Sequence, residues 1–91
     1  MQFEWDDSKS NACFATRGFD FAYAARVFLD PGRLVEIDDR LDYGEPRFRI
    51  FGLIDGRLFV VAYTIRAEVI RLISARKANR REIRHYGQSS R

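Results

Sequence analysis

The first third of the chain shows the apolar spacing of α-helices. In residues 21–28, apolar side chains stand at positions i, i+3, i+4 and i+7, which places them on one helix face, and the preceding aspartate is a suitable N-cap. A shorter helix is expected between Asp7 and Gly18, with Cys13 and Phe14 as its apolar anchors. The pattern therefore predicts two N-terminal helices.

From residue 33 onward the apolar period changes to two, which is typical of β-strands. Four strands are expected, over residues 33–37, 47–54, 58–65 and 69–76. An acidic loop reaching to about Pro46 separates the first two, and Asp55-Gly56 predicts a tight hairpin between the next two. The strand over 58–65 is apolar on both faces, so we expect it at the centre of a sheet that is covered on both sides.

The C-terminal segment predicts a third helix. Asn79 and Glu82 stand three residues apart, as the N-cap and the acid of a capping box. The helix is expected to present Ile83 and Tyr86 inward and to end at Gly87. The predicted order is α-α-β-β-β-β-α in one domain over residues 1–91, which indicates the α+β class with a four-stranded, mainly antiparallel sheet.

Charge is polarised along this chain. Residues 66–91 hold eight Lys and Arg residues against two acids, a net charge of +6, whereas the first 65 hold eight against eleven, a net charge of −3. A basic end is typical of a polyanion-binding surface, and a solvated arginine-rich helix is the alternative. Fourteen of the sixteen basic residues are arginine, whose guanidinium pairs bidentately with phosphate, although a GC-rich genome produces the same bias.

The residue inventory argues against several kinds of chemistry. The chain has one histidine, His85, one cysteine, Cys13, and no glycine-rich phosphate loop, so a metal centre, a Ser-His-Asp triad and a Cys-His nucleophile are poorly supported. Neither a metal nor a cofactor is expected. A single cysteine fits a reducing compartment, and neither an export signal nor an apolar run of 18 residues is present, which predicts a cytoplasmic protein without membrane contact.

Arginines on the predicted strands are the main candidates for a functional site. Arg47 and Arg49 share one face of their strand, and Arg66 lies at the end of the central strand. Arg71 and Arg76 are five residues apart, an odd number, so regular alternation predicts that they project from opposite faces of the sheet. At most one of this last pair is therefore expected in a cluster on a given face.

Such arginines beside Tyr63 or Tyr86 would grip an RNA phosphate and stack a base. RNA is cleaved without a metal when the ribose 2′-hydroxyl attacks the adjacent phosphate, provided that the protein orients the attack, stabilises the added charge and protonates the leaving oxygen. Arginines supply the charge stabilisation. A tyrosine, His85 or a carboxylate is left for proton transfer, and the sequence does not decide among them. A salt bridge to the acidic loop is the alternative role for each arginine.

An ordered set of short motifs gives the chain a family resemblance. The motifs are Phe3-Glu4-Trp5-Asp6 with Lys9, Gly18-Phe19-Asp20-Phe21, Tyr63-Thr64 with Arg66, and Arg71-Leu72-Ile73-Ser74-Ala75-Arg76-Lys77-Ala78. Together they resemble the BrnT family of type II toxin–antitoxin toxins, whose members look like small RelE-like, metal-free ribonucleases. The resemblance covers nearly the whole chain.

The resemblance implies a RelE-like toxin that cleaves RNA, inhibits translation and is neutralised by a cognate BrnA-type antitoxin. The antitoxin would carry a ribbon-helix-helix DNA-binding part and form a heterotetramer with the toxin. Operator DNA would then be bound only through the antitoxin.

The resemblance also selects candidate site residues. The implied catalytic residues are Arg66, Arg76 and Tyr86, and the implied RNA-binding residues are Arg47, Arg17, Lys9, Trp5, Tyr63 and Lys77. The family usually carries Lys-His where this chain has Thr16-Arg17, so Arg17 is expected to hold a phosphate at best. A catalytically weak toxin that acts with its antitoxin as a corepressor is therefore the alternative, and a general RNA-binding domain is a third reading.

Overall fold

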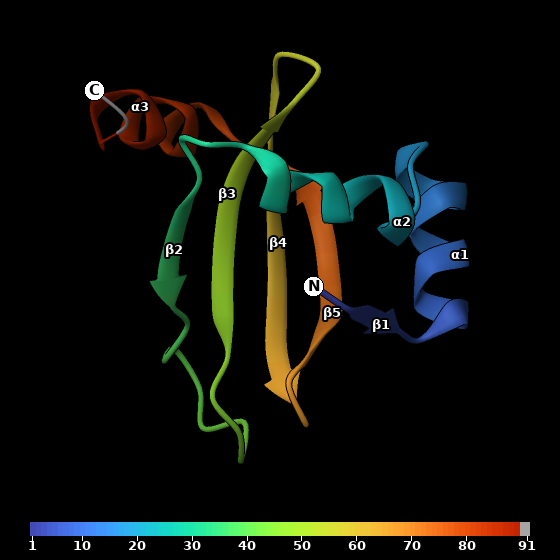
Figure 1. Cartoon of the computed structure of the whole chain (residues 1–91). Helices are drawn as coiled ribbons and strands as arrows, with labels where there is room; N and C mark the ends of the chain where they lie inside the picture. The colour runs from blue at the N-terminus through green and yellow to red at the C-terminus, as the bar shows by residue number, and fades with distance from the viewer. Residues whose placement is uncertain (90–91) are drawn as a thin grey trace.

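A five-stranded mixed sheet forms the centre of the molecule, and helices pack on both of its faces (Figure 1). The computed structural model describes residues 1–89. In chain order the elements are β1 (Phe3–Trp5), α1 (Asp7–Arg17), α2 (Phe21–Ala24), the 3-10 helix η1 (Ala25–Leu29), β2 (Leu34–Ile37), β3 (Phe48–Ile54), β4 (Arg57–Arg66), β5 (Val69–Lys77) and α3 (Arg80–Ser89). None of the described helices has the length and apolarity that crossing a bilayer requires.

The α+β class is confirmed, but the number of strands and their order differ from the prediction. Strands lie in the order β1-β5-β4-β3-β2, with β1 parallel to β5 and all other neighbours antiparallel. The sheet therefore has five strands instead of four, and a strand precedes the first helix. Sequence periodicity missed β1 because it is three residues long, too short to show a repeat. Its Phe3 and Trp5 pack against the core, while Glu4 pairs with Arg71.

The two predicted N-terminal helices are present with altered details. α1 ends before Gly18, whose φ of +84° is the left-handed conformation expected at a helix end. Cys13 is buried, as predicted, but Phe14 is 60% exposed, so its role as an anchor is contradicted. One step along a helix turns a side chain by about 100°, which carries Phe14 away from the sheet. Residues 21–28 form α2 and then tighten into η1.

β4 is the central strand, with both faces covered, as its apolar sequence predicted. We call the two sheet faces the α1–α2 face and the α3 face. The main core lies on the α1–α2 face, where Phe59 and Val61 contact the N-terminal helices. On the α3 face, Leu58 and Val60 pack with Tyr86 of α3. α3 continues through Gly87 to Ser89, past the predicted helix end. Ile83 is 46% exposed, so the prediction that it faces inward is wrong, whereas Tyr86 does pack against the sheet.

Gly52 is required where η1 crosses β3. A Cβ at this position would lie 2.7 Å from the carbonyl oxygen of Val27 and 2.8 Å from its Cβ, closer than side-chain atoms approach backbone in folded proteins. We expect Gly52→Ala to lower the free energy of unfolding by about 1–3 kcal/mol, because η1 must move away from the sheet. Urea denaturation followed by Trp5 fluorescence measures this loss.

Gly87 offers the matched control for this substitution. It lies within α3, and a Cβ there would meet no atom within 4 Å. Gly87→Ala is expected to be neutral or slightly stabilising, because alanine favours the helix. Equal unfolding midpoints for the two variants would contradict the packing argument at Gly52.

A β-bulge in β5 places two arginines on the same sheet face. The pairing of β5 with β4 skips Ile73, so one extra residue is inserted into β5. Arg71 lies opposite Thr64, and Arg76 lies opposite Val60. Because those two β4 partners are four residues apart in an unbroken strand, both arginines project from the α3 face. The prediction that they lie on opposite faces is therefore wrong.

Candidate functional site

An array of arginine–carboxylate pairs covers the α3 face. The pairs are Arg47–Glu45 at 3.6 Å, Arg49–Glu36 at 3.4 Å, Arg66–Glu45 at 3.0 Å, Arg71–Glu4 at 2.6 Å and Arg76–Glu82 at 2.8 Å. Glu36 and Glu45 belong to the acidic segment that the sequence offered as the alternative partner of these arginines. Each guanidinium is thus held in place by a carboxylate, and an incoming phosphate has to share or displace that partner.

The structure does not bring Arg66 and Arg76 together. Arg76 lies opposite Val60 of β4, six residues from Arg66 along the same strand. At the rise of a β-strand, this separation is about 20 Å. Arg66 instead lies beside Arg47, since both contact Glu45. The two arginines that the resemblance implies as catalytic therefore lie at opposite ends of the sheet.

Three cationic residues converge where β5 ends. Arg17 is the last residue of α1, and Arg76 and Lys77 are the last residues of β5. With Phe19 they line a cavity of about 330 Å³, which we call the β5-end site. Lys9 lines a neighbouring cavity of about 210 Å³ that also includes Arg17. Residues some sixty positions apart in the sequence thus form one cationic region.

Glu82 fixes the guanidinium of Arg76. The Nη1 and Nη2 atoms of Arg76 each donate to a different carboxylate oxygen of Glu82, both at 2.8 Å. The predicted capping box is confirmed, because Glu82 also accepts from the backbone N–H of Asn79, and the Asn79 side chain accepts from the N–H of Glu82, both at 2.9 Å. The hydrogen bonds with Arg76 lower the pKa of Glu82 and raise that of Arg76, so the pair stays ionised.

Tyr86 is engaged away from this pair. Its hydroxyl donates to Oδ2 of Asp30 at 2.5 Å. Asp30 also accepts from the backbone N–H groups of Leu53 at 2.8 Å and Gly32 at 2.9 Å. The tyrosine therefore links α3 to the segment that follows η1. This arrangement gives the hydroxyl a structural partner.

Three other candidate residues lie outside the β5-end site. Tyr63 is 6% exposed on the α1–α2 face and packs between Phe28 and Phe48. A ring buried in this way cannot stack on an RNA base, so we do not retain Tyr63 as an RNA-binding residue. Trp5 is half-buried beside the main core, and His85 Nε2 lies 3.0 Å from Glu36.

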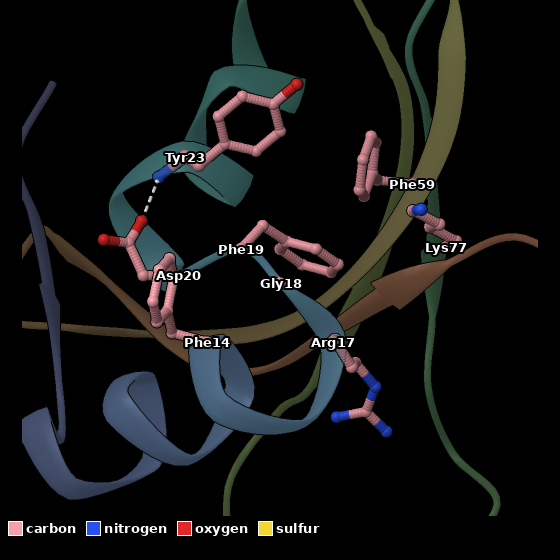
Figure 2. A pocket seen from close by; sticks show the side chains of 8 residues that line it. All are labelled: Phe14, Arg17, Gly18, Phe19, Asp20, Tyr23, Phe59 and Lys77. Atoms are coloured by element: carbon pink, nitrogen blue, oxygen red, sulfur yellow. Dashed lines mark hydrogen bonds between the residues drawn. The ribbon is translucent and has the colours of Figure 1, made fainter.

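An aromatic surface that the sequence pattern did not predict lies next to the β5-end site. A cavity of about 480 Å³ is lined by Phe14, Arg17, Gly18, Phe19, Asp20, Tyr23, Phe59 and Lys77 (Figure 2). The sequence predicts Phe14 in the core because apolar residues on short helices usually face inward. Its partners are on α2, β4 and β5, and no local pattern connects these elements. Within residues 1–89, no three His, Cys, Asp or Glu side chains are grouped in a way that would hold a metal ion.

A small α+β protein with cations gathered around a groove and across a sheet face is typical of proteins that bind phosphate polyanions. Residues 5–82 match the family model described as "Ribonuclease toxin, BrnT, of type II toxin-antitoxin system". Because the match spans most of the chain, this protein belongs to the BrnT family of ribonuclease toxins. The matched segment includes Arg17, Arg66 and Arg76, whereas Tyr86 lies beyond it. A search of curated proteins found no match to this chain.

Proposed function

We propose that this protein cleaves RNA at the β5-end site without a metal, by attack of a ribose 2′-hydroxyl on the adjacent phosphate. The observation that supports this site is the convergence of Arg17, Arg76 and Lys77 around one cavity. In this reaction the phosphate gains negative charge, and cationic donors that are already in place lower the energy of that state. Arg76 meets this requirement, because Glu82 holds it from one side.

The other cationic residues position the RNA strand. Arg17, Lys77 and Lys9 hold the phosphates that flank the cleaved bond. Arg66 and Arg47, about 20 Å away on the same sheet, contact the strand several nucleotides further along. This division assigns one of the two predicted catalytic arginines to the reaction and the other to RNA binding.

Tyr86 has a positioning role in this proposal. Its hydrogen bond to Asp30 holds α3 against the sheet, and α3 carries the glutamate that orients Arg76. Proton transfer is left to water. Catalysis then depends on positioning and charge stabilisation, which are large contributions in phosphoryl chemistry even without a dedicated acid or base.

Family membership supports the remaining parts of the proposal. A type II toxin acts with an antitoxin, and we propose a BrnA-type protein whose ribbon-helix-helix part binds operator DNA for the heterotetramer. The free toxin would cut RNA in the cytoplasm and thereby inhibit translation. The domain would be of the RelE-like type.

The products of cleavage test the mechanism directly. We expect the full-length protein to cut single-stranded RNA equally well with and without EDTA, and to leave 2′,3′-cyclic phosphate and 5′-hydroxyl ends. Fully 2′-O-methylated RNA, which lacks the attacking hydroxyl, is the control and should remain intact. Loss of cleavage in EDTA, or 5′-phosphate ends, would show that a metal-activated water is the nucleophile.

A corepressor without useful nuclease activity is the second candidate. The observation that favours it is Thr16-Arg17 at the end of α1, where the family pattern has Lys-His. Because Arg17 lies at the β5-end site, this departure removes a group that could transfer a proton beside Arg76. Protein that leaves RNA intact and tightens the binding of the antitoxin to operator DNA would establish this second role.

A further inference from the structure

The cavity of about 480 Å³ shown in Figure 2 adjoins the β5-end site and has no role in the reaction proposed above. The two share Arg17, Phe19 and Lys77. A nucleotide whose phosphate lies at the β5-end site would therefore have its base within reach of this cavity.

Aromatic rings form the floor and one rim of the cavity. Phe19 and Phe59 pack edge to face at 5.0 Å, and the Tyr23 ring lies 5.8 Å from Phe59, so the floor is fixed by mutual packing. At the rim, Phe14 is 60% exposed although it is apolar. Exposed rings beside a cationic groove are the usual platforms on which unpaired bases stack.

The polar groups lie on different sides of this floor. Figure 2 shows the Phe19 ring between Lys77 on one side and Asp20 on the other. One oxygen of Asp20 accepts from the backbone N–H of Tyr23 at 2.9 Å, as the N-cap of α2. A carboxylate has acceptor capacity on both oxygens, so the cap leaves Asp20 able to accept from a ligand.

We propose that this cavity is a subsite for one unpaired guanine of the RNA. The base stacks on the exposed ring of Phe14, above the floor to which Phe19 belongs. The phosphate faces Lys77 and Arg17, and the two neighbouring N–H donors of the Watson–Crick edge reach Asp20. Guanine fits this carboxylate because it presents two adjacent donors there, whereas adenine presents an acceptor next to a donor. This inference rests on the proposed function, since it names the base that the RNA site selects.

Base preference tests the subsite without requiring cleavage. The probes are 2′-O-methyl RNA pentamers that differ only at the central base, and fluorescence anisotropy measures their binding to the full-length protein. We expect wild type to prefer guanine, and Phe14→Ala to weaken guanine binding about tenfold. Phe14 is exposed, so this substitution leaves the fold intact. Leu29→Ala removes another exposed apolar side chain, which lines a different cavity, and should change nothing.

The substitution Asp20→Asn is expected to change the base preference instead of weakening the binding of guanine alone. Asparagine caps a helix as well as aspartate does, so α2 is kept. The amide offers one donor and one acceptor, which matches adenine, so the preference should shift from guanine to adenine.

The outcomes separate this subsite from the nuclease proposal. Guanine preference that depends on Phe14, in a protein that cuts no RNA, would support the subsite and contradict the nuclease. Equal binding of all four bases by wild type, or unchanged binding by Phe14→Ala, would overturn the subsite even if RNA is cut. Loss of antitoxin affinity in Phe14→Ala, with RNA binding unaltered, would assign this surface to the protein partner and overturn the proposal as well.

Discussion

Replacing Arg76 by alanine is expected to lower the rate of RNA cleavage by about 10²- to 10³-fold, the usual cost of removing one donor that stabilises transition-state charge. Arg66→Ala is expected to weaken RNA binding with a much smaller effect on the rate of the bound complex. The difference follows from position. Arg76 lies at the convergence of cations, whereas Arg66 lies about 20 Å away beside Glu45. Single-turnover cleavage at saturating protein separates the two effects.

Two further variants control for structural damage at this position. Arg76→Ala leaves the part-buried carboxylate of Glu82 without its ion-pair partner, so part of any loss would come from a shifted α3. The double variant Arg76→Ala with Glu82→Gln removes the stranded charge and should still fail to cleave. Arg76→Lys keeps the charge but loses the bidentate geometry, and should retain partial activity. Equal single-turnover rates for Arg76→Ala and Arg66→Ala would contradict the assignment of the reaction to the β5-end site.

Growth of cells that express the toxin without its antitoxin gives the corresponding result in vivo. Wild type and Arg66→Ala should arrest growth to different degrees, and Arg76→Ala should not arrest it. An arrest that is unchanged by both substitutions would remove both arginines from the site.

The regular parts of the fold could be predicted because local sequence determines them. Strand 58–65 is apolar on both faces, which is consistent only with a central position, and β4 occupies it. Asp55-Gly56 encodes its hairpin, since both residues have positive φ, 49° and 80°. The capping box at Asn79 and Glu82 likewise formed as expected. In each case neighbouring residues alone carry the information.

The parts that were mispredicted depend on contacts between distant segments. β1 exists because its three residues pair with Ile70, Arg71 and Leu72, about 67 positions away in the sequence. The bulge at Ile73 is equally invisible locally, because nothing in the sequence of β5 marks an extra residue. That single insertion decides which face Arg76 occupies relative to Arg71.

The candidate site shows the same division. The motifs indicate Arg76, Arg17 and Lys77, but they group these residues with Arg66 and Tyr63, which the structure places elsewhere. Motif spacing indicates which residues are candidates for function, but it does not show which of them lie close together in the folded protein. Their meeting depends on how α1 packs against the end of β5.

The buried carboxylate of Asp30 is the site of the largest expected stability loss. It accepts from the Tyr86 hydroxyl and from the backbone N–H groups of Leu53 and Gly32. Asp30→Ala leaves these donors without their acceptor, and we expect the free energy of unfolding to fall by about 3 kcal/mol. Tyr86→Phe removes one of the three bonds and should cost about 1.5 kcal/mol. Urea denaturation at pH 7 measures both.

The contribution of Asp30 to the free energy of unfolding should also depend on pH. Burial raises the pKa of Asp30, but the hydrogen bonds from Tyr86, Leu53 and Gly32 together lower it by more than burial raises it. The folded-state pKa therefore lies below the ordinary value of 3.8. The stabilisation is therefore fully present above that ordinary value and is lost as pH falls through the lower folded-state pKa. Wild type should lose stability in this acidic window more steeply than Asp30→Asn, which cannot titrate.

Tyr86→Phe also decides between the two roles of Tyr86. If the hydroxyl only positions α3, cleavage should fall in parallel with the order of that helix, and a stabilising substitution such as Gly87→Ala should restore part of both. If the hydroxyl transfers a proton at the phosphate, the variant should lose far more cleavage than its loss of stability explains, and Gly87→Ala should restore stability without restoring cleavage. Because Asp30 already accepts from this hydroxyl at 2.5 Å, we expect the first result.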